Sequence, residues 1–111
     1  MDDLMKSLER VRNDLHVAMK MLRQNGNEMA KAEASYQAVK YQTAMKLRAE
    51  GMPVTMIEAI IKGHPDVNEK LFERMTARVL YESNKESINV SMKDLDVIND
   101  QISREWHSGD L

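Results

Sequence analysis

Both prolines of the chain and two of its four glycines lie in one short segment, residues 50–66, which reads EGMPVTMIEAIIKGHPD. Proline and glycine are the residues that most strongly interrupt helices. Outside this segment the chain has no proline, and its only glycines are Gly26 and Gly109. The pattern therefore predicts two long helices joined by a short, interrupted connection.

The stretch before this segment carries a heptad repeat of the kind found in coiled coils. Its seam positions follow alternating steps of four and three residues, which places them on one face of an α-helix. The phase continues unchanged through Asn25-Gly26-Asn27, although this tripeptide is typical of a turn. A true turn would have no reason to preserve the phase, so we expect one helix over about residues 3–49, with Gly26 as a weak point. The predicted seam is Leu4, Leu8, Val11, Leu15, Ala18, Leu22, Asn25, Met29, Ala32, Tyr36, Val39 and Thr43.

The stretch after the segment predicts a second long helix, over about residues 66–107. Asp66 is expected to cap its start, with Glu69 completing a capping box. The first turns predict a local shift of the apolar stripe, or an extra packing partner, because four apolar residues step by four. These four are Val67, Leu71, Met75 and Val79. The later seam positions step by three and four and are Tyr81, Asn84, Ile88, Ser91, Leu95, Ile98 and Ile102.

The connection itself contains apolar residues at helical spacing, with Thr55 available as a cap and Gly63 as a stop. We expect a short helix over about residues 55–62. The fold class predicted for residues 1–111 is thus a single all-α domain, an elongated antiparallel helical hairpin.

A bare hairpin buries only one stripe of each helix, so we expect a homo-oligomer or a partner helix to cover the rest. The apolar residues off the seam that should remain partly exposed are Met5, Met19, Met21, Phe72, Leu80, Val90, Met92 and Val97.

Composition narrows the possible functions. The chain has 111 residues, a formal net charge of −2 and no cysteine. This charge balance does not indicate a strongly basic nucleic-acid binder, and the lack of cysteine excludes a disulfide framework and the usual zinc ligand sets. Charges recur from the first residues onward, which is unlike a signal peptide or a membrane span. We expect a cytoplasmic protein that does not bind membranes.

No group of residues predicts catalysis. His16, His64 and His107 lie far apart in sequence, and no pair has a helical metal-ligand spacing. The serines lack a nucleophile-elbow context, and no glycine-rich phosphate loop is present. We therefore expect no enzyme, cofactor or metal, unless a site forms between subunits. For His64, the expected role is helix capping.

Two stretches resemble a known family. They are Leu47-Arg48-Ala49-Glu50-Gly51-Met52-Pro53-Val54-Thr55 and, near the end, Arg104-Glu105-Trp106. They resemble segments of small helical proteins encoded by phages and prophages of Gram-positive bacteria, and the similarity spans about residues 28–107. The resemblance implies a phage accessory protein in the host cytoplasm, often from a replication and recombination setting. It implies no catalytic residues. Secreted WXG-type hairpins have a similar length, but their Trp-x-Gly turn is absent here.

The leading hypothesis is a non-enzymatic protein that acts through protein–protein interaction, with replication, recombination or other DNA-metabolism proteins of phage or host. Its candidate partner-binding residues are Met52, Ile57, Ile61, Lys62, Arg104 and Trp106. For Trp106, a packing cap over the end of the bundle is an equal alternative.

Two other functions stay open. The first is a nucleic-acid-binding protein that contacts phosphates through basic residues near the hairpin tip. Glutamates share that region, so an ordinary solvated surface is the competing interpretation. The residues in question are Lys46, Arg48, Lys62, Lys70, Arg74 and Arg78. The second alternative is an inhibitor of a host enzyme or defence system, for which no individual residue provides evidence.

Overall fold

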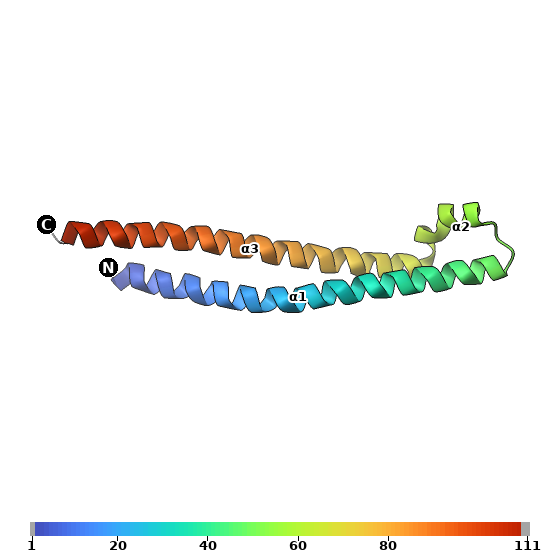
Figure 1. Ribbon diagram of the computed structural model, residues 1–111, viewed down its shortest axis with the longest axis horizontal. Helices are drawn as coiled ribbons and strands as arrows, with labels where there is room; N and C mark the ends of the chain where they lie inside the picture. The colour runs from blue at the N-terminus through green and yellow to red at the C-terminus, as the bar shows by residue number, and fades with distance from the viewer. Residues whose placement is uncertain (1, 110–111) are drawn as a thin grey trace. The chain divides into compact units, whose positions relative to one another are not determined.

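The computed structural model describes residues 2–109, and within this range every regular element is helical. Figure 1 shows their order. The elements are α1 (Asp2–Ala49), α2 (Val54–Ile60), the short 3-10 helix η1 (Ile61–Gly63) and α3 (Pro65–Gly109). The all-α class is confirmed, and the predicted helix bounds agree closely with those observed.

The chain divides into two compact units. Unit 1 draws on Met1–Gln24 and Glu82–Leu111, and unit 2 is Asn25–Tyr81. Each unit therefore holds one segment of α1 and one segment of α3.

The two helix segments are antiparallel in both units. In unit 2, Gly26 lies beside the ring of Tyr81, and Glu33 forms an ion pair with Arg74, so residue numbers fall along α3 as they rise along α1. In unit 1, a hollow lined by Ser7, Arg10, Val11, Asp14, Asp94, Val97 and Ile98 lies between the two segments, and Asn84 contacts Ala18. A helical hairpin arrangement is thus confirmed within each unit.

The predicted seam of α1 is its buried face. Every seam position from Leu4 to Thr43 is buried or half-buried. The helix runs through Gly26 without a break. The unbroken heptad phase was therefore a better guide than the turn-like tripeptide around this glycine.

The seam of α3 is confirmed from Tyr81 to Ile102 and corrected nearer its start. Val67 is fully buried, but Met75 and Val79 are exposed. Arg74 and Ala77 are the half-buried positions instead, so the heptad phase continues without a local shift. The other alternative, an extra packing partner, is confirmed, because Val67 and Leu71 pack in one core with Ile57 of α2 and Ile61 of η1. The expected stripe fails beyond Leu71, because the long Arg74 side chain takes a seam position that a purely apolar pattern would not assign to it.

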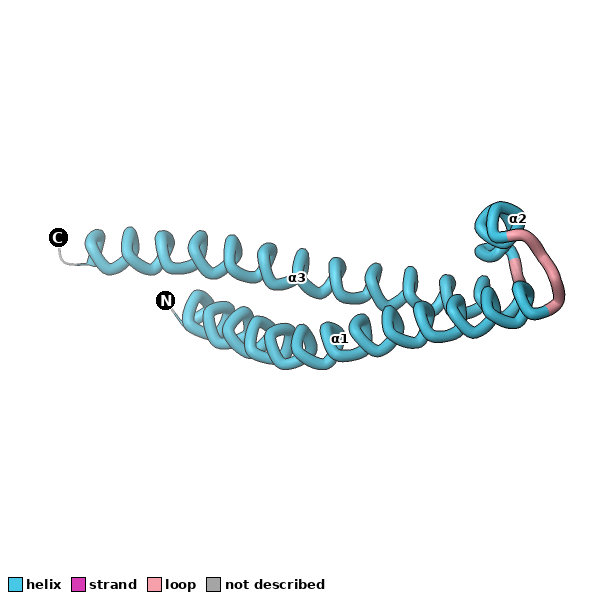
Figure 2. Tube along the Cα trace, turned by 45° about the vertical axis from the view of Figure 1, so that its right-hand side comes forward, coloured by secondary structure: helices cyan, strands magenta, loops and turns pink. Residues whose placement is uncertain are grey.

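A small core lies at the closed end of unit 2, where α2 and η1 connect the two long helices. Its buried members are Tyr36, Ile57, Ile61 and Val67. Half-buried side chains pack around them, namely Val39, Ala44, Leu47, Met52 and Leu71. Each such large apolar side chain contributes about 1.5–3 kcal/mol when fully buried. Figure 2 shows α2 and the loops beside it. Helix α2 carries the core residue Ile57, and η1 carries Ile61.

The end of α1 is a Schellman motif. Gly51 has a positive φ of 94°. Its N–H donates to the carbonyl of Arg48 at 3.0 Å, and the N–H of Met52 donates to the carbonyl of Leu47 at 3.1 Å. These two hydrogen bonds, and the apolar pair Leu47 and Met52 that packs on the core, define this C-cap. The chain reversal is therefore fixed by Gly51 and tied to the core.

The start of α2 differs from expectation, whereas at the start of α3 the capping role predicted for His64 is confirmed and the one predicted for Asp66 is wrong. The Nδ1 atom of His64 accepts a hydrogen bond from the N–H of Asp66 at 3.3 Å, so His64 rather than Asp66 caps α3. Pro65 follows at the first helical position, where a missing N–H costs nothing. Helix α2 follows Pro53 and has no side-chain cap, so the predicted role of Thr55 is wrong.

Replacing Gly51 with alanine should lower the free energy of unfolding by about 1–2 kcal/mol, because a side chain disfavours the left-handed conformation found there. Urea denaturation followed by circular dichroism measures this loss. The matched control is Gly63→Ala, where φ is not positive and a Cβ would meet nothing within 4 Å. Equal losses in the two variants would contradict the assigned cap.

Replacing Gly26 with alanine should raise the free energy of unfolding by about 1 kcal/mol through helix propensity. The added Cβ would lie 3.5 Å from the Tyr81 ring, an ordinary van der Waals distance. Thermal and urea denaturation measure the gain. A clear loss of stability would show that α1 bends or ends at this position in solution.

Candidate functional site

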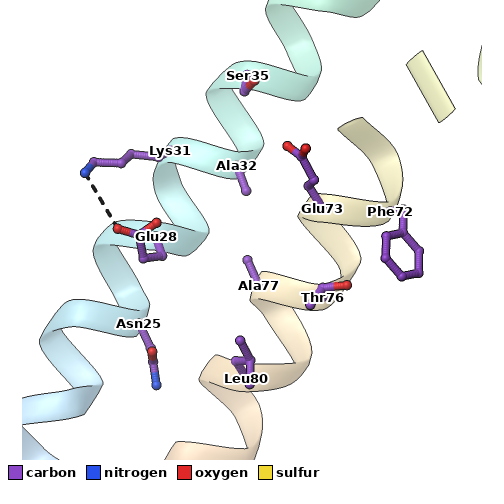
Figure 3. Close-up of a pocket in the computed structure, with 10 residues that line it drawn as sticks. All are labelled: Asn25, Glu28, Lys31, Ala32, Ser35, Phe72, Glu73, Thr76, Ala77 and Leu80. Carbon is purple, nitrogen blue, oxygen red and sulfur yellow. Dashed lines mark ion pairs between the residues drawn. The ribbon is translucent and has the colours of Figure 1, made fainter. Parts of the chain in front are cut away.

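The main hollow described in unit 2 is a groove of about 490 Å³ between α1 and α3. Figure 3 shows the methyl groups of Ala32 and Ala77 directed toward the space between the two helices. These small side chains leave the groove open. The residues that line it are Asn25, Glu28, Lys31, Ala32, Ser35, Phe72, Glu73, Thr76, Ala77 and Leu80.

The rim of the groove carries exposed apolar side chains on α3 and charged side chains on both helices. Phe72, the only phenylalanine of the chain, is 71% exposed, and Leu80 is exposed as well. Lys31 pairs with Glu28 at 3.7 Å on α1. On α3, Glu73 pairs with Lys70 at 3.3 Å. The charged groups thus have partners within the chain, while the apolar side chains have their outer surfaces in solvent.

The apolar rim continues along the outside of α3. Met75 and Val79 are exposed, three and seven residues after Phe72. This spacing places them on the same side of the helix as Phe72, away from the seam. We call this set the α3 stripe, and it consists of Phe72, Met75, Val79 and Leu80.

A second exposed apolar surface lies on α2. We call it the tip surface, and it consists of Val54, Met56 and Ile60. Two predicted partner-binding residues of this segment, Ile57 and Ile61, lie in the core instead, so their side chains do not belong to an exposed surface. Of the other two candidates here, Met52 is half-buried against the core and Lys62 is exposed.

The remaining partner-binding candidates lie near the end of α3, in unit 1. Arg104 is exposed, and Trp106 is 65% exposed. Trp106 therefore does not bury its ring as a packing cap, which corrects that alternative. These two residues and the tip surface belong to different units.

The basic residues considered for phosphate binding all lie in unit 2. Two of them are held by carboxylates of the chain. Lys70 pairs with Glu73, and Arg74 pairs through Nε with Glu33. The Arg74 guanidinium also lies 4.9 Å from the centroid of the Tyr36 ring, within the range of a cation–π interaction.

Another basic candidate, Lys46, lines a hollow together with Asp66 and Glu69. Arg48, Lys62 and Arg78 are exposed on the surface of the same unit. These six residues therefore do not form an uninterrupted basic surface, because acidic side chains lie among them.

The site's lining suits contact with apolar side chains. Among residues 2–109 there is no group of three or more His, Cys, Asp or Glu side chains placed to hold a metal ion. In the same range, no helix is both long enough and apolar enough to cross a membrane.

No family model, curated protein or solved structure matches the chain. The phage resemblance stays a prediction.

Sequence reasoning found part of this site. Phe72 and Leu80 were expected to be exposed as apolar residues off the seam, and they are. The groove beside them was missed, because it depends on which residues of α1 and α3 face each other. One signal was available: Ala32 and Ala77 are small residues at or next to seam positions, where small side chains leave space.

Replacing Arg74 with alanine should lower the free energy of unfolding by about 1–2 kcal/mol, since the interaction with Tyr36 and the ion pair with Glu33 are both lost. Urea denaturation at low and high salt measures this. The control is Lys70→Ala, which removes an exposed ion pair worth about 0–1 kcal/mol. An Arg74 variant as stable as the wild type would show that this side chain is free for a ligand.

Proposed function

We propose that this chain is a non-enzymatic interaction protein that binds a protein partner through exposed apolar surfaces of its helices. One observation carries the proposal. Among the described residues, seventeen large hydrophobic side chains are exposed, whereas only five apolar residues are buried. Exposed apolar side chains that gather on one helix face mark surfaces for a protein partner, and the α3 stripe and the tip surface are two such groups.

The tip surface is the proposed docking site for that partner. Val54, Met56 and Ile60 are exposed on a short helix whose position is fixed by the core beneath it. Exposed apolar side chains on a rigid support bind with little loss of conformational entropy. The neighbouring Met52 and Lys62 extend this surface, and Arg104 with Trp106 form a separate candidate surface in unit 1.

The resemblance to phage and prophage proteins indicates what kind of partner to seek. We propose a protein of replication, recombination or other DNA metabolism, from the phage or its host, met in the bacterial cytoplasm. An inhibitor of a host enzyme or defence system would use the same surfaces. Direct nucleic-acid binding has less support, because Lys70 and Arg74 form ion pairs with glutamates of the chain.

Affinity capture with mass spectrometry, from phage-infected cells of a Gram-positive bacterium, should recover a specific protein with the wild-type chain. Met56→Glu should abolish the capture, because it places a charge in the tip surface. The control is Met19→Glu, which changes another methionine of similar exposure, 58% against 53%, in unit 1.

The proposal is contradicted if the wild-type chain captures no protein, or if the two variants behave alike. Recovery of nucleic acid with an affinity that falls steeply in salt would favour the phosphate-binding alternative instead.

A further inference from the structure

We infer that the groove of unit 2 binds a second copy of this chain, with Phe72 of each copy seated between Ala32 and Ala77 of the other. The inference deepens the proposed function by naming the occupant of one apolar surface. It leaves the tip surface for a different protein.

The groove and its rim are complementary to themselves. A two-fold symmetric interface places the same patch on both partners, so the patch must fit its own copy. This one carries both halves of such a fit, the exposed ring of Phe72 and a hollow lined by Ala32 and Ala77. Figure 3 shows the Phe72 ring projecting from α3 on the side away from α1, where a second molecule could receive it.

The charges around the groove also permit two copies to meet. Glu28 and Lys31 on α1 and Lys70 and Glu73 on α3 supply two charges of each sign. The patch is therefore close to neutral, so two copies do not repel each other there. Each copy also offers both signs for ion pairs across the interface.

Two further residues of the α3 stripe, Met75 and Val79, lie along the outer face of α3 beside Phe72. When two helix pairs pack through such stripes they form a four-helix arrangement, in which each copy covers apolar residues of the other. A single foreign helix in the groove would leave part of the stripe in solvent.

The test is the mass of the chain in solution, measured by light scattering and sedimentation over a series of concentrations. The wild-type chain should be a dimer. Phe72→Asp should raise the dissociation constant at least about 30-fold, the effect expected for loss of a central aromatic residue. The control is Tyr41→Asp, which changes a 67% exposed aromatic residue of unit 2 that does not line the groove. It should dimerise like the wild type.

A second measurement does not depend on how well the aspartate variants fold. Thr76 is four residues from both Phe72 and Leu80, so a two-fold axis through the patch brings its two copies together. The chain has no cysteine, so Thr76→Cys introduces the only thiol. Oxidation should give a covalent dimer, whereas Thr55→Cys on α2 should not.

The inference is overturned if the wild type is monomeric at every concentration, or if Phe72→Asp dimerises like Tyr41→Asp. It is also overturned if the two cysteine variants cross-link equally, or if the chain forms open-ended oligomers rather than a dimer. A monomer that still captures a protein in a Met56-dependent way would refute the inference and leave the proposed function standing. A dimer that captures no other protein would support the inference and contradict the proposed function.

Discussion

Tyr36 and Val67 are the two large side chains that are fully buried in the described residues, and they belong to the same core at the closed end of unit 2. Around them the chain reverses direction through α2 and η1. Arg74 lies over the Tyr36 ring and pairs with Glu33, which joins α3 to α1 beside this core. Four of the five buried apolar residues belong to this one cluster. The pairing of the two helix segments in unit 2 therefore depends on it.

Unit 1 is held together in another way. Its seam is mostly half-buried. Among the described residues of this unit the one buried polar side chain, Asn84, donates from Nδ2 to the carbonyl of Ala18 at 3.0 Å. A buried amide that loses its partner is costly, so this hydrogen bond favours one register of the two helices over its neighbours. Unit 2 thus gains its register from apolar packing, whereas unit 1 gains specificity from a polar contact. Neither seam covers the outer apolar side chains, which is why a partner is expected.

The sequence predicted the features that depend on local periodicity. Helix bounds and seam positions follow from the fixed rotation per residue, so they could be read without knowing the tertiary structure. Met75 and Val79 were wrongly assigned to the buried stripe of α3, because they are more hydrophobic than Arg74. Arg74 is half-buried instead, through cation–π and ion-pair contacts with residues of α1. The roles of Ile57 and Ile61 also could not be read. Helix α2 is apolar on several sides, so only its packing against Tyr36 and Val67 selects its buried face. The groove could not be predicted from local periodicity either, because it depends on Ala32 of α1 and Ala77 of α3 facing each other.

Intermolecular contacts at the groove test the central claim most directly. In a sample that mixes isotope-labelled and unlabelled chains, filtered nuclear Overhauser spectra detect only protons of different copies that lie close together. The account predicts cross-peaks between the ring protons of Phe72 in one copy and the methyl protons of Ala32 and Ala77 in the other. A sample with no such cross-peaks, or with intermolecular cross-peaks confined to α2 or to unit 1, would contradict it.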